Sequence, residues 1–229
     1  MGKLVSIVIF VHNEEEALPN FLRELANQRL SLDHYRFNLF FACNGCNDNS
    51  VKLCEEASDN FADLFESYIV YDWSEPSKSM AWNRSVRLLQ EQNSPDFIVF
   101  MDSDISIESA TCIEDLLREF SDDKCQIVTS KPVKQFSSST PWFLKVASKI
   151  VGNKHQDGAV CGQLYAARAS AVHDLYLPVP CLVEDGFIAA TMVTNYFTEN
   201  PDPSYVRASK RAWHFLNLLL GCLISLITM

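Results

Sequence analysis

The sequence predicts an α/β fold with a Rossmann-like, mostly parallel central sheet flanked by helices. Short apolar runs alternate with amphipathic segments at helical spacing, and clusters of polar residues follow the runs directly. Such alternation predicts parallel strands, because parallel neighbours need a crossover that helices supply. The length of 229 residues suits one large domain better than two small ones.

Four predicted strands lie in the first half of the chain, each followed by a predicted helix. Continuous apolar runs of this length are typical of strands that are buried on both faces. The strands are expected at residues 4–11, 37–42, 66–72 and 97–101. The helices are expected at residues 14–28, 49–58, 79–92 and 107–120, where apolar side chains recur at helical spacing.

The pattern after residue 125 is less regular. It indicates a strand at 125–133, a helix at 141–151, a strand or extended segment at 158–168 and a helix at 183–196. No repeat or Pro/Ser-rich linker divides residues 1–206, which we expect to form one catalytic domain.

Residues 207–229 begin with basic side chains and then become almost entirely apolar, which predicts a hydrophobic C-terminal helix. The run from Trp213 is about 17 residues long, at the lower limit for crossing a bilayer. An interfacial anchor, a membrane segment and a buried helix all remain open. We expect membrane contact through this helix.

The composition excludes some classes of function. A net charge of −10 with no basic stripe argues against nucleic-acid binding. The N-terminus enters a strand without a signal peptide, so we expect a cytoplasmic protein, at the cytoplasmic face of a membrane if the C-terminal helix is an anchor. The eight cysteines are irregularly spaced and are expected to be reduced thiols.

Polar clusters follow all four of the first strands. They are the sequences HNE at 12–14, NGCND at 44–48, DWS at 72–74 and DSD at 102–104. Ligands of open α/β sheets bind beyond the carboxyl ends of the strands. The four clusters are therefore expected to line one edge of the sheet.

Two acidic pairs in this pattern suit transfer chemistry. Asp102 and Asp104 could hold a hard divalent cation together with water and phosphate, or could only stabilise the start of the next helix. Glu184 and Asp185 could supply a base or could likewise be helix N-terminal acids. Lys78 before a helix favours phosphate binding.

Cys43 and Cys46 have the spacing of a redox pair or of half a zinc site. A zinc site lacks a second pair of ligands at suitable spacing. The predicted helix begins after both thiols, which argues against thiol activation at a helix N-terminus. A turn after a buried strand is the favoured interpretation.

Read in order, the segments SIVIFVHNEEEAL, ACNGCNDNS, KSMAWNRS, VFMDSDI, CGQLYAAR and VED resemble the successive motifs of the family 2 glycosyltransferases, which have the GT-A fold. The resemblance covers roughly residues 4–195. It implies an inverting transferase that takes a sugar from a UDP-, GDP- or dTDP-linked donor. The acceptor is expected to be a saccharide or a lipid-linked molecule, as in glycan or cell-envelope synthesis.

The resemblance also implies roles for individual residues. Donor contacts are implied for Val11, Glu14, Asn44, Lys78, Asn83, Asp102, Gly162 and Arg168. Asp104, together with Asp102, is implied to bind Mg²⁺ or Mn²⁺. Asp185, next to Glu184, is implied to be the base that deprotonates the acceptor hydroxyl.

The chain departs from the family pattern at three positions and lacks one motif. Cys43, Phe10 and Ser85 replace an aspartate, a proline and a glycine that are common there. No Gln-x-x-Arg-Trp of processive synthases is present, which favours the addition of one sugar. Alternatives are a catalytically degenerate protein that binds a nucleotide sugar or a membrane partner, a nucleotidyl transferase, and a thiol-dependent binder.

Overall fold

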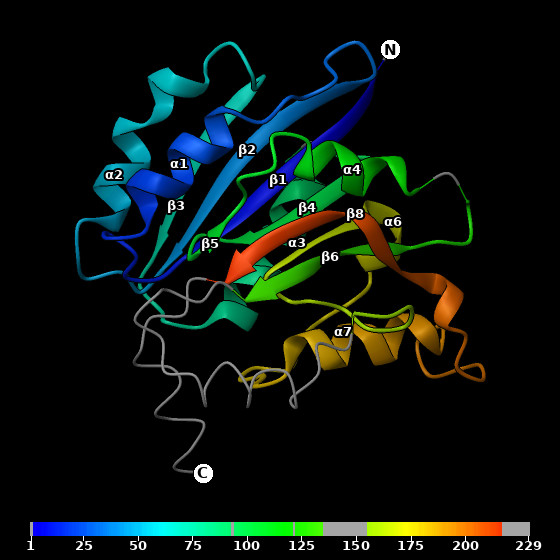
Figure 1. The fold of residues 1–229 in the computed structure, drawn as a ribbon. Coiled ribbons are helices and arrows are strands. Elements are labelled where there is room, and N and C mark those ends of the chain that lie inside the picture. Colours follow the sequence, from blue (N-terminus) through cyan, green and yellow to red (C-terminus); the bar gives the residue numbers. More distant parts are fainter. Residues whose placement is uncertain (1, 93, 121, 135–154, 217–229) are drawn as a thin grey trace, which may run out of the picture.

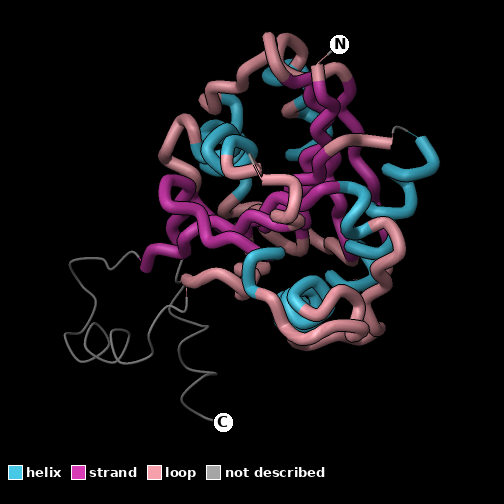
Figure 2. Tube along the Cα trace, turned by 90° about the vertical axis from the view of Figure 1, so that its right-hand side faces the viewer, coloured by secondary structure: helices cyan, strands magenta, loops and turns pink. Residues whose placement is uncertain are grey.

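The computed structural model describes residues 2–92, 94–120, 122–134 and 155–216, and in these the strands form one sheet with helices on both faces (Figures 1 and 2). The strands are β1 (Lys3–Val11), β2 (Tyr35–Asn44), β3 (Ser67–Trp73), β4 (Phe97–Asp102), β5 (Ile105–Ser106), β6 (Ile127–Lys134), β7 (Leu164–Arg168) and β8 (Val206–Leu216). The helices are α1 (Leu18–Ala26), α2 (Ser50–Glu56), α3 (Lys78–Gln92), α4 (Cys112–Arg118), α6 (Ala169–Val172) and α7 (Glu184–Val193), with 3₁₀ turns η1 (Ser58–Phe61) and η2 (Pro203–Tyr205).

The sheet has the strand order β3-β2-β1-β4-β7-β6-β8-β5. The first four of these are parallel neighbours, and β7 is antiparallel to both β4 and β6. Because β8 is parallel to β6, β7 and the short β5 are the only strands in the described part of the chain that run against the common direction. The prediction of a mostly parallel sheet is confirmed. The start of β7, rather than its end, therefore lies at the edge where β1 and β4 finish.

The sheet is buried on both faces because alternate residues of β1 enter two apolar clusters. Val5, Ile7 and Ile9 pack with α1, α2 and α4, whereas Val8 and Phe10 pack with α3, α6 and α7. These five side chains are at most 5% exposed. Close packing on both sides fixes the ends of the central strands. The loops that follow these strands thus start from a rigid platform.

The four predicted strand and helix pairs of the first half are present. The helix predicted at 107–120 is shorter, because residues 105–106 form β5 and only Cys112–Arg118 is helical. The strand predicted at 158–168 is confirmed only for Leu164–Arg168. The helix predicted at 141–151 lies outside the described residues.

The C-terminal helix predicted from Arg207 is wrong as far as Leu216, because Val206–Leu216 form β8. This strand pairs with β6 from Val206 to Leu216 and joins the sheet to β5. Aromatic and apolar residues suit either a strand or a buried helix, and the free edge of β6 decides for the strand. Residues 217–229 of the predicted helix lie outside the described part. Within that part, no helix combines the length and apolar character needed to cross a bilayer.

Candidate active site at the carboxyl edge of the sheet

The loops after β1 and β2 are tied together at the predicted edge. The Asn44 side-chain amide donates to the carbonyl of Val11 (3.0 Å), and the backbone N–H of Glu14 donates to Ser50 Oγ (2.8 Å). Nδ1 of His12 lies 2.6 Å from the carbonyl oxygen of Asn44. Asn44 is 4% exposed and its amide nitrogen is used within the protein. Its role in the structure is to hold these loops in place.

The turn after β2 requires a glycine. Gly45 has φ +66°, in the left-handed region, and its N–H donates to the carbonyl of Trp73 (2.6 Å). A Cβ at this position would lie 2.7 Å from the Cβ of Pro76. Backbone conformation and close approach both exclude a larger residue. The loop between β3 and α3 is therefore packed directly against this turn.

The two cysteines that flank Gly45 are not arranged as a redox centre. Cys43 is completely buried, and its proximity to Cys54 together with burial raises the pKa of its thiol. Burial also raises the pKa of Cys46, whose Sγ lies 3.5 Å from the carbonyl oxygen of Val11. Thiol reactivity needs a lowered pKa. The structure therefore favours packing over thiol chemistry.

A lysine lies at the centre of the polar residues at this edge. Lys78, the first residue of α3, places Nζ 2.5 and 2.7 Å from the two carboxylate oxygens of Asp102 at the end of β4. The same Nζ lies 3.7 Å from Glu184 Oε1 and donates to the carbonyl of Gly162 (3.4 Å). Four segments that are far apart in the sequence thus meet at one ammonium group.

The carboxylates around Lys78 are crowded. Burial raises the pKa of Asp102 to about 6, although the attraction of Lys78 opposes the shift. Burial, followed by repulsion from Asp104 and Asp102, raises the pKa of Glu14 to about 7. Carboxyl groups with raised pKa values in one place are typical of functional sites. Such a concentration of negative charge favours a bound cation.

Asp104 has the features of a cation ligand. Its Oδ1 is buried and has no hydrogen-bond partner among the described residues. In the described ranges, no three or more His, Cys, Asp and Glu side chains are grouped so that they could hold a metal by themselves. Mg²⁺ and Mn²⁺ sites commonly use one or two carboxylates and complete the coordination with water and phosphate. Asp104 and Asp102 fit such a shared site.

Asp185 faces the site from the first turn of α7. A Cβ at Gly162 would lie 3.1 Å from the Asp185 Cβ and 3.9 Å from its Oδ2, so the two residues are immediate neighbours. Oδ1 accepts a hydrogen bond from the backbone N–H of Gly186 (2.8 Å), and the side chain is partly exposed. Gly162 keeps the space beside the Asp185 carboxylate open.

The side chain of Asn83 is held by the backbone of Leu177. Its Nδ2 donates to the carbonyl of Leu177 (2.9 Å), and its Oδ1 accepts from the Leu177 N–H (2.8 Å). Both ends of the amide are therefore used to fix the segment that leads to α7. We do not retain Asn83 as a donor contact.

Arg168 does not lie with the other predicted site residues. It pairs with Phe97, the first residue of β4, whereas Asp102 is the last. Its guanidinium donates to the carbonyl of Cys125 (2.9 Å) and lies 5.4 Å from the ring centroid of Phe120. The sequence predicted that Arg168 lies beside the donor pocket. Because β7 is antiparallel to β4, the end of β7 lies at the opposite edge of the sheet. Arg168 stabilises the opposite edge of the sheet.

Two residues of the site were not singled out from the sequence. Ser103 is 1% exposed, and its Oγ donates to the carbonyl of Phe10 (2.9 Å), which holds the end of β4 against the end of β1. Ser50 orients Glu14 through the hydrogen bond described above. The position of Ser103 between two aspartates was the available signal for the first, and the position of Ser50 at the end of the segment ACNGCNDNS was the signal for the second.

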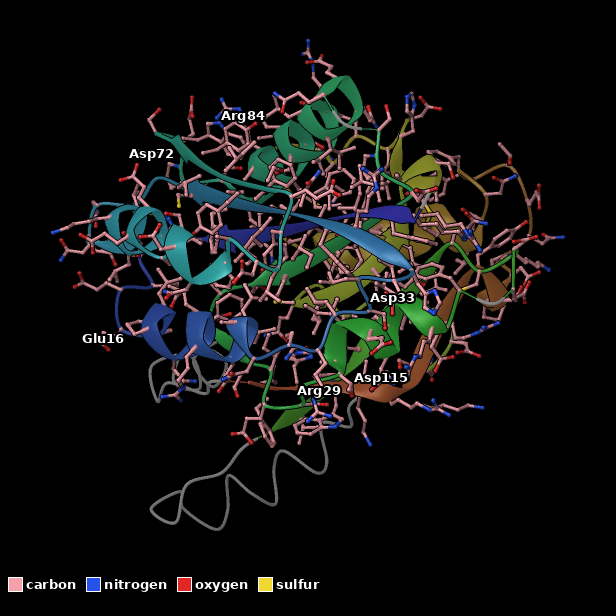
Figure 3. The ribbon with its side chains drawn as sticks, turned by 90° about the horizontal axis from the view of Figure 1, so that it is seen from above. Glu16, Arg29, Asp33, Asp72, Arg84 and Asp115 are labelled. Atoms are coloured by element: carbon pink, nitrogen blue, oxygen red, sulfur yellow. The ribbon has the colours of Figure 1, made fainter. Side chains whose placement is uncertain are left out.

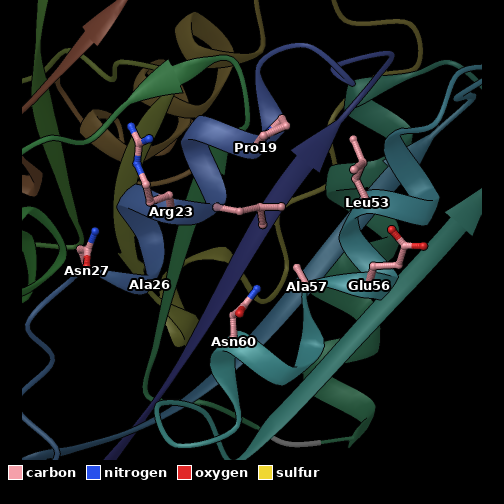
Figure 4. Close-up of a pocket in the computed structure, with 9 residues that line it drawn as sticks. Pro19, Arg23, Ala26, Asn27, Leu53, Glu56, Ala57 and Asn60 are labelled. Atoms are coloured by element: carbon pink, nitrogen blue, oxygen red, sulfur yellow. The ribbon is translucent and has the colours of Figure 1, made fainter.

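Two other features of the surface include none of the residues that meet at Lys78. Asp72, in the predicted DWS cluster, is exposed at the β3 side, where Arg84 also lies (Figure 3). Arg84 pairs with Glu75 at 2.8 Å. A groove of about 480 Å³ runs between α1 and α2 (Figure 4), and its lining includes Leu22 and Leu53 but none of the predicted site residues.

Comparison with protein families gives one match that covers most of the chain. The model of "Glycosyl transferase family 2" matches residues 6–170. The chain belongs to this family. The sequence-based assignment is therefore confirmed.

Comparison with curated proteins identifies more distant relatives. The chain is 27% identical over 147 residues to an undecaprenyl-phosphate 4-deoxy-4-formamido-L-arabinose transferase of Proteus mirabilis, a match that covers 64% of this chain and 41% of the relative. A protein of the same name from Pseudomonas savastanoi is 28% identical over 103 residues, 28% of its length. The chain thus matches less than half of the length of each of these relatives.

Solved structures show the same fold. A mannosyltransferase from Pyrobaculum calidifontis in complex with GDP-Man and Mn²⁺ superposes with a TM-score of 0.63 at 16% identity, covering 92% of this chain and 59% of the other. A glucosyl-3-phosphoglycerate synthase from Mycobacterium tuberculosis, in complex with Mn²⁺, UDP and glucosyl-3-phosphoglycerate, gives 0.60 at 17% identity, covering 97% and 75%. The fold is that of the GT-A glycosyltransferases.

Proposed function

We propose that the chain transfers one sugar from a nucleoside diphosphate sugar to an acceptor hydroxyl, with inversion at the anomeric carbon. The observation that carries this proposal is a cluster of charged groups at the carboxyl edge of the sheet. Lys78 lies there between the carboxylates of Asp102 and Glu184. Gly162, whose carbonyl also accepts from Lys78, places Asp185 next to them. This cluster combines an ammonium group that can bind phosphate, carboxylates that can bind a metal ion, and a partly exposed carboxylate that can act as a base. Complexes of the two structural relatives with Mn²⁺ and nucleotides support it.

Donor binding requires compensation of the diphosphate charge. Asp104 and Asp102 would hold Mg²⁺ or Mn²⁺, which when bound offsets the negative charge that develops on the leaving nucleoside diphosphate. Lys78 adds a further positive charge at the start of α3. The loops that carry Val11 and Glu14 are fixed beside these groups and supply the walls for the nucleoside.

Asp185 is proposed as the base. Its carboxylate accepts the proton of the acceptor hydroxyl while the acceptor oxygen bonds to the anomeric carbon and the electron pair of the broken bond passes to the diphosphate. General bases contribute about 10²–10⁴-fold to rates. Glu184, held 3.7 Å from Lys78, helps to position this turn of α7.

The test is release of nucleoside diphosphate from UDP-, GDP- and dTDP-sugars in the presence of Mn²⁺ and a panel of saccharide acceptors. Asp104→Ala and Asp185→Asn should each lower the rate by about 10²-fold or more, since they remove a metal ligand and the base. Asp33→Asn, an exposed aspartate elsewhere on the surface, is the matched control. Donor binding without release by the wild type would instead support the degenerate binder.

A lipid-linked phosphate is the alternative to a hydroxyl acceptor, and the names of the curated relatives support it. A phosphate monoester has a second pKa of about 6 and needs no base at pH 8. With undecaprenyl phosphate as acceptor, Asp185→Asn should therefore cost much less activity than with a hydroxyl acceptor. The activity of Asp185→Asn relative to the wild type, measured with each of the two acceptors, distinguishes a phosphate acceptor from a hydroxyl acceptor.

The proposed place of action is the cytoplasmic face of a membrane. The support is the lipid phosphate in the names of the relatives and the thirteen residues after Leu216, which contain no charged side chain. Liposome flotation of the chain with and without residues 217–229 tests it. Equal recovery of both forms in the soluble fraction would exclude contact through this segment.

A further inference from the structure

Lys78 forms an ion pair with Asp102, one of the two carboxylates that would bind the divalent cation. Its ammonium lies within 2.7 Å of both oxygens of Asp102, the closest ion pair of the site. Asp104, in contrast, keeps a buried oxygen without a partner in the described part of the chain. One of the two metal ligands is therefore free, and the other is neutralised by the protein itself.

The surroundings of the ammonium hold it there. Nζ also approaches Glu184 (3.7 Å) and the carbonyl of Gly162 (3.4 Å), and lies 5.7 Å from the ring centroid of Phe10. The Lys78 side chain is 31% exposed, so it still has a side open to solvent. A divalent cation bound by Asp102 would repel this ammonium, because like charges so close in a partly buried site interact strongly.

A diphosphate changes this balance. It supplies several negative oxygens that an ammonium can bind, and a lysine has a long flexible side chain with three donors. Once Lys78 turns to phosphate, both oxygens of Asp102 are free for the cation. The nucleotide thus removes the competitor at the same time as it adds ligands for the metal.

We propose that Lys78 makes cation binding depend on the nucleotide, by pairing with Asp102 in the free protein and with the diphosphate in the complex. This inference rests on the proposed function. It adds a physical reason for coupling between the two ligands, and such coupling is reciprocal, so that the cation strengthens nucleotide binding by the same factor. Free protein would bind little metal, and the full site would form only with donor present.

The experiment is a titration of Mn²⁺ into the full chain, followed by calorimetry and by the electron paramagnetic resonance signal of free Mn²⁺, with and without UDP or GDP. For the wild type, we expect the nucleotide to strengthen Mn²⁺ binding at least tenfold. For Lys78→Met, which removes the charge from a side chain of similar length, Mn²⁺ binding without nucleotide should be about tenfold tighter than in the wild type. The strengthening by nucleotide should then shrink to a few-fold.

Lys52→Met is the matched control, since Lys52 lies on the surface and pairs only loosely with Glu56 (3.6 Å). Its Mn²⁺ and nucleotide binding should equal those of the wild type. Circular dichroism and thermal unfolding establish that Lys78→Met is folded, and Lys78→Arg, which keeps the charge, should retain weak binding of Mn²⁺ alone.

Two results overturn the proposal in distinguishable ways. If Lys78→Met binds Mn²⁺ alone as weakly as the wild type, or keeps the full strengthening by nucleotide, Lys78 does not connect the two ligands and the proposed function is unaffected. If the wild type binds neither UDP nor GDP with Mn²⁺ present, the proposed function fails for these nucleotides and the coupling fails with it.

Discussion

Replacement of Asn83 by leucine separates a structural role from a role in donor binding. Asn83 Nδ2 and Oδ1 make hydrogen bonds of 2.9 and 2.8 Å to the carbonyl and the N–H of Leu177, whose side chain is completely buried. Leucine has nearly the size of asparagine but neither donor nor acceptor. Asn83→Leu therefore leaves two backbone groups of Leu177 without their partner.

The expected loss of stability follows from these two contacts. A partly buried donor or acceptor left without a partner costs about 1–3 kcal/mol. Two such groups are left here, and water can replace part of the lost hydrogen bonding. We therefore expect the free energy of unfolding to fall by about 3 kcal/mol in total. For a chain of this length, about 2–4 °C are lost per kcal/mol, so the melting temperature should fall by about 6–12 °C.

The assay combines urea unfolding with calorimetric binding of UDP or GDP in the presence of Mn²⁺, at a temperature where the variant is folded. Nucleotide affinity should stay within about twofold, because Asn83 faces Leu177. Transfer to the acceptor should slow, since the segment after Leu177 leads to Asp185. Asn200→Leu, at an exposed asparagine in the loop before η2, should change stability by less than about 0.5 kcal/mol. Unchanged stability with a tenfold loss of nucleotide affinity would refute the reasoning and return Asn83 to the donor site.

Three further predictions concern the framework of the site. Gly45→Ala should destabilise the protein by at least about 1–2 kcal/mol because alanine is strained at a φ of +66°, and circular dichroism melts measure this loss. The same change should weaken nucleotide binding because Pro76 must move, and calorimetry measures the affinity. Arg168→Met should lower stability by about 2 kcal/mol in urea unfolding without changing nucleotide affinity, since it breaks the bond to the carbonyl of Cys125; a selective loss of affinity would contradict its placement. Burial, with a smaller contribution from His155, lowers the pKa of His214 from 6.5 to about 4. Between these values the unfolded chain binds a proton that the folded chain does not, so stability should fall by up to about 3 kcal/mol as the pH drops from 6.5 to 4. Urea midpoints for His214→Phe should lack this part of the pH dependence, and an unchanged slope would exclude His214 as its source.

Much of the candidate site was predictable because it follows from the direction of strands. Asp102 ends the buried strand β4 and Asp104 lies in the turn that follows it, and parallel neighbours bring such strand ends to one edge. The same argument places the loops after β1 and β2, although it does not show how Asn44 and Ser50 tie them together. The predicted positions of these polar clusters depended only on local pattern and on one general rule.

The errors arose where partners distant in sequence decide the structure. Arg168 was predicted to contact the donor because of its place in a family motif. The antiparallel direction of β7 puts this residue at the other edge of the sheet. Residues 207–216 have a composition that suits helix or strand, and the edge of β6 selects the strand. Asn83 follows Lys78 by five residues on the same helix, and nothing in the sequence indicates that its amide pairs with the backbone of Leu177. None of these outcomes has a local signal.

The sequence by itself determined the class of fold, the order of the first four strand and helix pairs and the carboxylates at the strand ends, because hydrophobic period and strand direction are local properties. Only the tertiary structure decided that Lys78 is shared by Asp102 and Glu184, residues 24 and 106 positions further along the chain. An ion pair of this kind depends on the relative position of packed elements, which is set by the whole core. The distribution of charge at the site is therefore a property of the fold rather than of any one motif.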